Sequence, residues 1–175
     1  MNNNVTPVSF GANYLSEFVN QKTKERLSFV EYEHGFYDLV HLQKQTQNWN
    51  TKEGDKIFGN YWNSYKNGNV TKRFYGLENN DGDIVALCET KINDDKNDAE
   101  KYAVINVQSV AADPKAVKSK YDIKSLTSYF KREIKKQSDK CKDSISHMLS
   151  SRGKIISTGL DENGCIEVKV IEPDK

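Results

Sequence analysis

The sequence predicts an α/β fold of the α+β kind, in which helices flank a central mixed, mostly antiparallel sheet. Segments that alternate apolar and polar residues, as strands do, stand before and after segments with helical spacing. The chain has 175 residues, the size of one ordinary domain, and its nine Tyr, seven Phe and two Trp can supply a core. We therefore expect a single domain over residues 1–175, with an N-terminal segment, 1–24, that packs on a body formed by 25–175.

The first elements are a strand and two helices. Residues 27–32 alternate and are rich in β-branched and aromatic side chains, which predicts a strand. Helical spacing then predicts helices over 35–47 and 55–66, joined by a loop at 48–54. Gly68 follows the second helix, and glycine commonly ends helices because it adopts the left-handed conformation easily.

Three strands follow. Residues 73–78 and 84–92 enclose the turn 79–83, whose Asn, Asp and Gly residues tolerate positive φ, and this pattern predicts a hairpin. Residues 102–110 are almost continuously apolar, which is typical of strands covered on both faces. We expect this last strand to be an interior strand of the sheet.

The remaining elements are a long helix and a closing hairpin. Asp113 and Pro114 break the preceding strand, and helical spacing continues from residue 124 to about residue 142. Asp122 or Ser125 is expected to cap this helix. Residues 144–149 fit a strand or a helix. The closing hairpin is predicted over residues 154–158 and 165–171, with a turn at 161–164.

Composition and motifs disfavour several classes of protein. The apolar stretches are shorter than the roughly 20 residues that cross a bilayer, and the Met-Asn-Asn-Asn start lacks the regions of a signal peptide. We therefore expect a cytoplasmic protein without a membrane partner, although export without a signal would leave no trace in the sequence. Cys88, Cys141 and Cys165 have no C-x-x-C spacing, so neither a disulfide framework nor a zinc knuckle is expected.

Charge is distributed unevenly, although the net charge is only +1. Residues 115–142 contain ten basic and three acidic residues, a local charge of +7. Such a cluster can attract phosphate, on a cofactor or on nucleic acid. A solvated, lysine-rich helix face is the alternative interpretation.

The order of these elements resembles that of the GNAT family of N-acetyltransferases. In that family a strand with a V-x-P type exit is followed by a loop whose backbone N–H groups bind the acetyl-CoA pyrophosphate, and a helix begins there. The matching segments are 107–114 (Val-Gln-Ser-Val-Ala-Ala-Asp-Pro), 115–122 and the helix from residue 124. Free amide donors and the positive end of a helix both favour a diphosphate. The resemblance implies that acetyl-CoA is bound by Val107, Ser109, Val110, Ala116, Val117, Lys118, Ser119, Lys120, Tyr121 and Asp122.

The resemblance also implies a reaction, in which an amine attacks the thioester while a base removes its proton and a tyrosine protonates the thiolate. Topology places Glu89 best for the base, and Tyr129 is the candidate tyrosine. A solvent-facing strand residue is the alternative for Glu89, and core packing is the alternative for Tyr129. The expected function is an acyl-CoA-dependent N-acyltransferase that moves an acetyl group from acetyl-CoA to an amine of a small molecule or a protein.

A second function remains open, because residues 115–126 contain no glycine, whereas small residues let the family's loop approach the phosphates closely. The alternative is a non-catalytic GNAT-like binding protein that engages a protein or, less expected, a nucleic acid.

Cysteine and histidine chemistry receives less support. His34, His41 and His147 lack the spacing of metal ligands, so no metal is expected. Cys88 stands in an apolar strand, where we expect it to be buried and inert rather than a nucleophile paired with a histidine.

Overall fold

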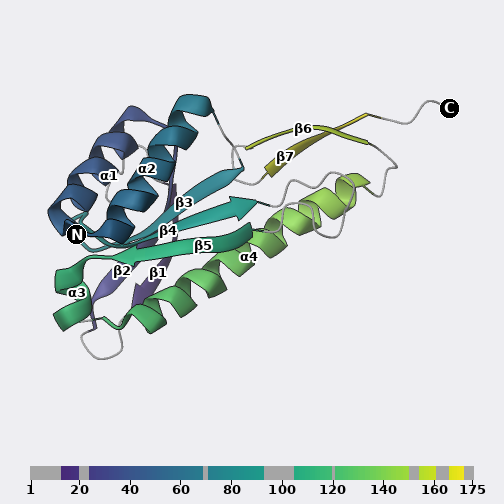
Figure 1. Ribbon diagram of the computed structural model, residues 1–175. Coiled ribbons are helices and arrows are strands. Elements are labelled where there is room, and N and C mark those ends of the chain that lie inside the picture. Colours follow the sequence, from purple (N-terminus) through teal and green to yellow (C-terminus); the bar gives the residue numbers. More distant parts are fainter. Residues whose placement is uncertain are drawn as a thin grey trace, which may run out of the picture.

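The computed structural model describes the chain in seven stretches, over residues 13–19, 24–68, 71–92, 105–119, 121–149, 154–160 and 166–171. Its centre is a five-stranded sheet with helices on both faces (Figure 1). This arrangement confirms the predicted α+β class. No helix in the described part of the chain is long and apolar enough to span a membrane.

The central sheet is antiparallel throughout its described strands. The spatial order of the strands is the order of the chain, namely β1 (Asn13–Val19), β2 (Arg26–Tyr32), β3 (Lys72–Glu78), β4 (Ile84–Ile92) and β5 (Ile105–Ala112). The parallel component of a mixed sheet is not found among these strands. The strand β1 was not predicted from the sequence, which indicated only a segment packed on the body.

Two helices cover one face of the sheet. They are α1 (Phe36–Trp49) and α2 (Lys52–Asn67), and their connection is much shorter than the predicted loop at 48–54. Asn50 has the left-handed φ of 51°, which ends α1. Thr51 then begins α2 by accepting a hydrogen bond from the backbone N–H of Gly54 at 3.1 Å. The predicted glycine end of α2 is confirmed, because Gly68 has a φ of 61°.

A single long helix, α4 (Ile123–Leu149), covers the other face. Between β5 and α4 the structure has a short helix, α3 (Pro114–Ser119), where the sequence predicted a basic loop. The residues 144–149, which fitted a strand or a helix, continue α4. Among the described side chains of α4, the lysines and Arg132 are exposed and Glu133 is buried, while an apolar stripe faces the sheet.

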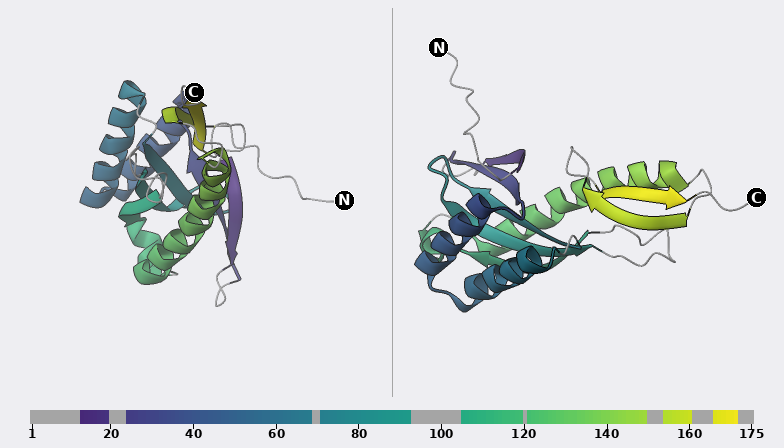
Figure 2. Two further views of the ribbon diagram at one scale, coloured as in Figure 1. Left: turned by 90° about the vertical axis from the view of Figure 1, so that its right-hand side faces the viewer. Right: turned by 90° about the horizontal axis from the view of Figure 1, so that it is seen from above.

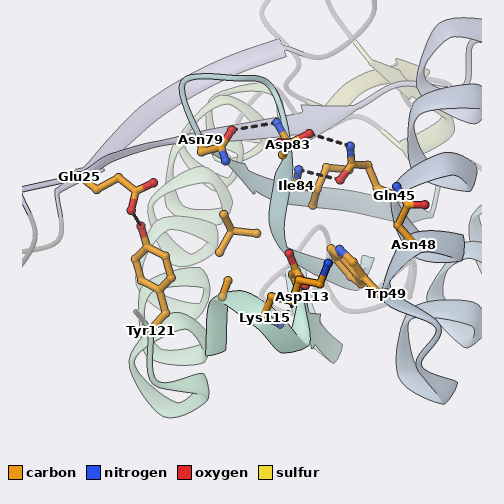
Figure 3. Close-up of a pocket in the computed structure, with 12 residues that line it drawn as sticks. Glu25, Gln45, Asn48, Trp49, Asn79, Asp83, Ile84, Asp113, Lys115 and Tyr121 are labelled. Atoms are coloured by element: carbon orange, nitrogen blue, oxygen red, sulfur yellow. Dashed lines mark hydrogen bonds between the residues drawn. The ribbon is translucent and has the colours of Figure 1, made fainter. Parts of the chain in front are cut away.

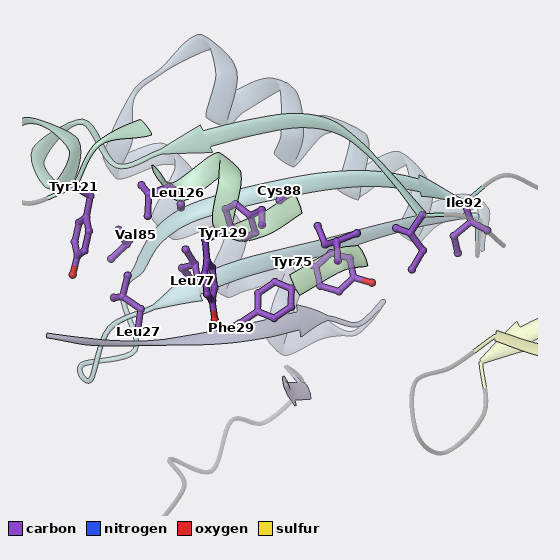
Figure 4. Packing of buried hydrophobic residues seen from close by; sticks show 14 residues of the cluster. Leu27, Phe29, Tyr75, Leu77, Val85, Cys88, Ile92, Tyr121, Leu126 and Tyr129 are labelled. Carbon is purple, nitrogen blue, oxygen red and sulfur yellow. The ribbon is translucent and has the colours of Figure 1, made fainter. Parts of the chain in front are cut away.

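Two apolar clusters hold these layers together, one on each face of the sheet. The cluster on the α4 face contains Phe29, Tyr75, Cys88 and Phe130 among others (Figure 4). The cluster on the other face joins α1 and α2 to the sheet and is centred on Tyr61. The strands β2 to β5 therefore contribute apolar residues to both faces, whereas β1 contributes only to the cluster on the α4 face.

The prediction that the strand after residue 101 is interior is wrong, because β5 lies at an edge of the five-stranded sheet and pairs with β4 alone among the described strands. The described part of the predicted strand begins at Ile105, since residues 102–104 lie outside the described residues. The apolar run still has a physical reason. Both α2 and α4 contact β5, so its two faces are covered although its outer edge pairs with no other described strand.

The predicted closing hairpin is confirmed by the antiparallel pairing of β6 (Lys154–Leu160) with β7 (Ile166–Ile171). The predicted turn at 161–164 lies outside the described residues. The hairpin forms a sheet of its own, separate from the five-stranded sheet and beside the end of α4 (Figure 2).

Candidate functional site

The segment expected to bind phosphate has both of its helix starts capped by carboxylates. At α3, the Lys115 backbone N–H donates to Asp113 Oδ1 at 3.0 Å. At α4, Asp122 Oδ1 accepts from the Lys124 backbone N–H at 3.3 Å, which confirms Asp122 as a cap. These negative groups stand where the partial positive charge of a helix start would attract an anion. They compete with a phosphate for the same donors.

Tyr121 fills the space between the two helices. Its side chain is 6% exposed and belongs to the core cluster on the α4 face. The hydroxyl donates to Glu25 Oε2 at 2.7 Å, which fastens the segment to the residue before β2. Burial raises the pKa of Tyr121, and the hydrogen bond to Glu25 adds to the effect. The tyrosine is thus part of the core.

The other residues expected to bind acetyl-CoA lie on two faces of the sheet. Ser109 pairs with Glu89 across β4 and β5, on the side of α2. Lys118 is exposed on α3, the side chain of Ser119 is outside the described part, and so is the whole of Lys120. The four apolar members pack against the cluster on the α4 face, and they are Val107, Val110, Ala116 and Val117.

The two candidate catalytic residues do not meet. Glu89 is 4% exposed, and its carboxylate accepts from Asn60 Nδ2 at 2.6 Å and from Lys72 Nζ at 3.4 Å. Because Asn60 belongs to α2, Glu89 points to that face of the sheet and not to bulk solvent. Tyr129 packs between Phe18 and Phe29 on the opposite face. The sheet separates the two side chains, so they cannot act on one substrate together.

A cavity of about 320 Å³ opens beside the C-terminal half of β5. Its lining comes from the start of α2, the end of β5, the helix α3 and the first residue of α4. The lining residues are Thr51, Glu53, Val110, Ala111, Ala112, Pro114, Val117 and Ile123. Most of these side chains are apolar. Two of them, Val110 and Val117, were expected to bind acetyl-CoA.

The backbone of β5 faces this cavity. The Asp113 N–H donates to the Val85 carbonyl at 2.8 Å, and antiparallel strands alternate between residues that bond to the neighbour and residues that do not. With the register of β4 and β5, Val110 and Ala112 are therefore non-bonded positions with respect to β4. Their N–H and C=O groups point to the outer edge, where no other described strand pairs with them.

A second cavity, of about 390 Å³, lies at the turn of the β3–β4 hairpin (Figure 3). Gln45 ties α1 to the turn, because its Nε2 donates to Asp83 at 3.2 Å and its Oε1 accepts from Ile84 at 3.3 Å. The cavity is lined by three carboxylates, those of Glu25, Asp83 and Asp113, and by one lysine, Lys115. This excess of negative charge disfavours a phosphorylated ligand.

A partly buried cluster of ionisable groups at the start of α1 was missed by the sequence analysis. Glu78 accepts hydrogen bonds from Tyr32 at 2.5 Å and from His41 at 3.2 Å. The Glu78 hydrogen bond raises the pKa of His41, while burial raises the pKa of the neighbouring Asp38 to about 6. These residues come from β2, α1 and β3, so no local motif could have indicated them.

Cys88 is completely buried, as predicted. Burial raises the pKa of its thiol, which opposes formation of the reactive thiolate. Among the described residues, no group of three His, Cys, Asp or Glu side chains could hold a metal ion.

Comparisons with protein-family models, with curated proteins and with solved structures give no match to this chain.

Proposed function

We propose that this chain is a non-catalytic binding protein that takes up an extended segment of a protein partner along the outer edge of β5. The observation that carries the proposal is the outward direction of the Val110 and Ala112 backbone groups, at two residues that line an apolar cavity. Strand addition of this kind combines backbone hydrogen bonds with pockets for alternate side chains of the added segment.

The composition of β5 supports this role. Edge strands are usually protected from pairing by charged side chains, proline or shortness. The eight residues of β5 include neither a charge nor a proline and extend for about 27 Å. The opposite edge strand, β1, has Glu17 in its middle, within 3.6 Å of Arg26. The β5 edge is therefore the more receptive of the two.

The segment expected to bind phosphate supports a binding protein over a CoA enzyme. Carboxylate caps occupy both helix starts, and Tyr121 is buried where an open loop was expected. The edge position of β5 also departs from the interior strand that we expected with the GNAT resemblance.

A proline substitution tests the proposal. Val110→Pro removes the outward N–H without removing a bond to β4, a position where edge strands tolerate proline. Val110→Ala is the matched control, because it also removes the branched valine side chain but keeps the N–H. Each variant is used to select peptides from a display library of short random sequences. The Val110→Ala protein should enrich peptides with alternating apolar residues, and the Val110→Pro protein should not. Equal enrichment by both variants would overturn the proposal.

An acyl-CoA-dependent N-acyltransferase is the second candidate function. It is favoured by the position of Glu89, a buried carboxylate one strand from the β5 edge and directly across from Ser109. Calorimetry with acetyl-CoA on the unmodified chain distinguishes the two functions. Acetyl-CoA binding that is weakened by Lys118→Ala and Lys120→Ala would support the acyltransferase. If millimolar acetyl-CoA gives no heat of binding, the non-catalytic binding protein is favoured.

A further inference from the structure

The described residues form two separate sheets, each with strand edges that pair with no other described strand. The five-stranded sheet ends at β5, and the hairpin of β6 and β7 forms a two-stranded sheet that pairs with no other described strand. An isolated two-stranded hairpin is marginally stable in water, and further strands or packing against a helix are generally needed. The hairpin packs on α4 through β7, but its strand edges pair with no other described strand, and neither does the outer edge of β5.

The helix α4 separates these two sheets. Its 27 residues extend for about 40 Å, whereas the β5 strand beside it extends for about 27 Å. The helix starts at the end of β5 and continues past the sheet, and β7 contacts it (Figures 1 and 2). The hairpin is thus held away from the β5 edge of its own copy.

The strands of the hairpin suit the β5 edge in composition. In β7, Ile, Val and Val alternate with Glu and Lys, the pattern of a strand with one covered face. Its two charges cancel, and β6 has one lysine, so little charge would be brought to the uncharged β5.

We propose that the strand taken up by β5 is an edge of the β6–β7 hairpin of a second copy of this chain. Each copy then gives its hairpin to the other, and each sheet grows from five strands to seven, five from one copy and two from its partner. A reciprocal exchange is a closed two-fold arrangement, because each copy offers the same two surfaces. The inference rests on the proposed function, since it requires β5 to accept a strand.

Light scattering across a dilution series, combined with cross-linking, tests this exchange on the full chain. Unlabelled and ¹⁵N-labelled protein are unfolded together, refolded together and treated with an amine cross-linker. We expect a dimer in which Lys154 or Lys169 of one isotope is linked to Lys118 or Lys56 of the other. Val110→Pro should raise the dimer dissociation constant by about tenfold or more, and Val110→Ala should change it much less.

Circular dichroism first establishes that each variant is folded. If Val110→Pro does not fold, Ala112→Pro takes its place, because it removes the second outward N–H. A dimer that withstands both proline variants would overturn the inference, because its interface would lie elsewhere. A monomer whose hairpin cross-links pair only like isotopes would also overturn it, while supporting strand uptake by β5 within one copy. A monomer without these cross-links would overturn the exchange of hairpins but not the uptake of a strand by β5. The peptide-library experiment then tests that proposed function separately.

Discussion

Gly76 lies beneath the ring of Tyr32, which crosses β3 to donate a hydrogen bond to Glu78. A Cβ at position 76 would collide with the Tyr32 ring and hydroxyl, so only glycine fits there. We predict that Gly76→Ala lowers the free energy of unfolding by about 1–3 kcal/mol, the range of overpacked cores. Urea denaturation measures this.

Gly59 is the matched control for that substitution. It lies within α2, and a Cβ there would meet nothing within 4 Å. Gly59→Ala should therefore stabilise the chain by about 0.5–1 kcal/mol, because alanine is the better helix former. If both substitutions changed stability equally, the close packing of Tyr32 on Gly76 would be refuted.

Asp38 makes the stability of the fold depend on pH. Burial raises its pKa from 3.8 to about 6. The hydrogen bond from the Glu33 backbone N–H and the charge of His41 oppose this shift, while the carboxylates of Glu33 and Glu78 add to it. Between these values the unfolded chain releases the proton of Asp38 while the folded chain keeps it, so stability falls as pH rises from 4 to 6. The raised pKa of His41 acts in the same direction as pH rises further.

Asp38→Asn tests this dependence, because the amide oxygen can still accept from the Glu33 N–H but no longer ionises. We predict that the variant loses less stability than the unmodified chain between pH 4 and pH 6. Denaturant titrations at a series of pH values measure the difference, and parallel curves for the two proteins would contradict it.

Among the elements, the connection between α1 and α2 depends on Thr51, whose hydroxyl caps α2. Thr51→Ala should lower the free energy of unfolding by about 1 kcal/mol, while Thr51→Ser, which keeps the hydroxyl, should cost much less. Urea denaturation of both variants makes the comparison. A serine variant as unstable as the alanine variant would show that the methyl group, and not the cap, matters.

Local patterns predicted most elements because period and turn chemistry are local properties. The hairpin of β3 and β4 followed from alternation around Asn79–Asp83, and Gly68 marked the end of α2. The apolar run of β5 could not reveal whether this strand is interior. Coverage of both faces by α2 and α4 gives an edge strand the same apolar run that an interior strand has. The strand β1 was missed because its residues are mostly half-exposed or exposed.

At the scale of the whole molecule, the candidate site was predicted only in part. Val110 and Val117 do line a cavity, but the expected phosphate loop is a capped helix, because Asp113 and Asp122 each stand directly before the first residue of a helix. Glu89 and Tyr129 are separated by the sheet, a distance in space that their positions in the chain do not reveal.

The exchange of hairpins, finally, predicts that the stability of this protein depends on its concentration. A dimer that buries the β5 edge is favoured by mass action, so the midpoint of thermal unfolding should rise as protein concentration rises. Amide hydrogen exchange at Val110 and Ala112 should slow over the same range, because their outward N–H groups would then be bonded to the partner's hairpin. The midpoint of the Val110→Pro chain should begin to rise only at about tenfold higher concentration or above, whereas Val110→Ala should follow the unmodified chain. Protection of Ala112 that is already complete at the lowest concentration, in a monomer, would mean that the edge is covered within one copy and would refute the exchange.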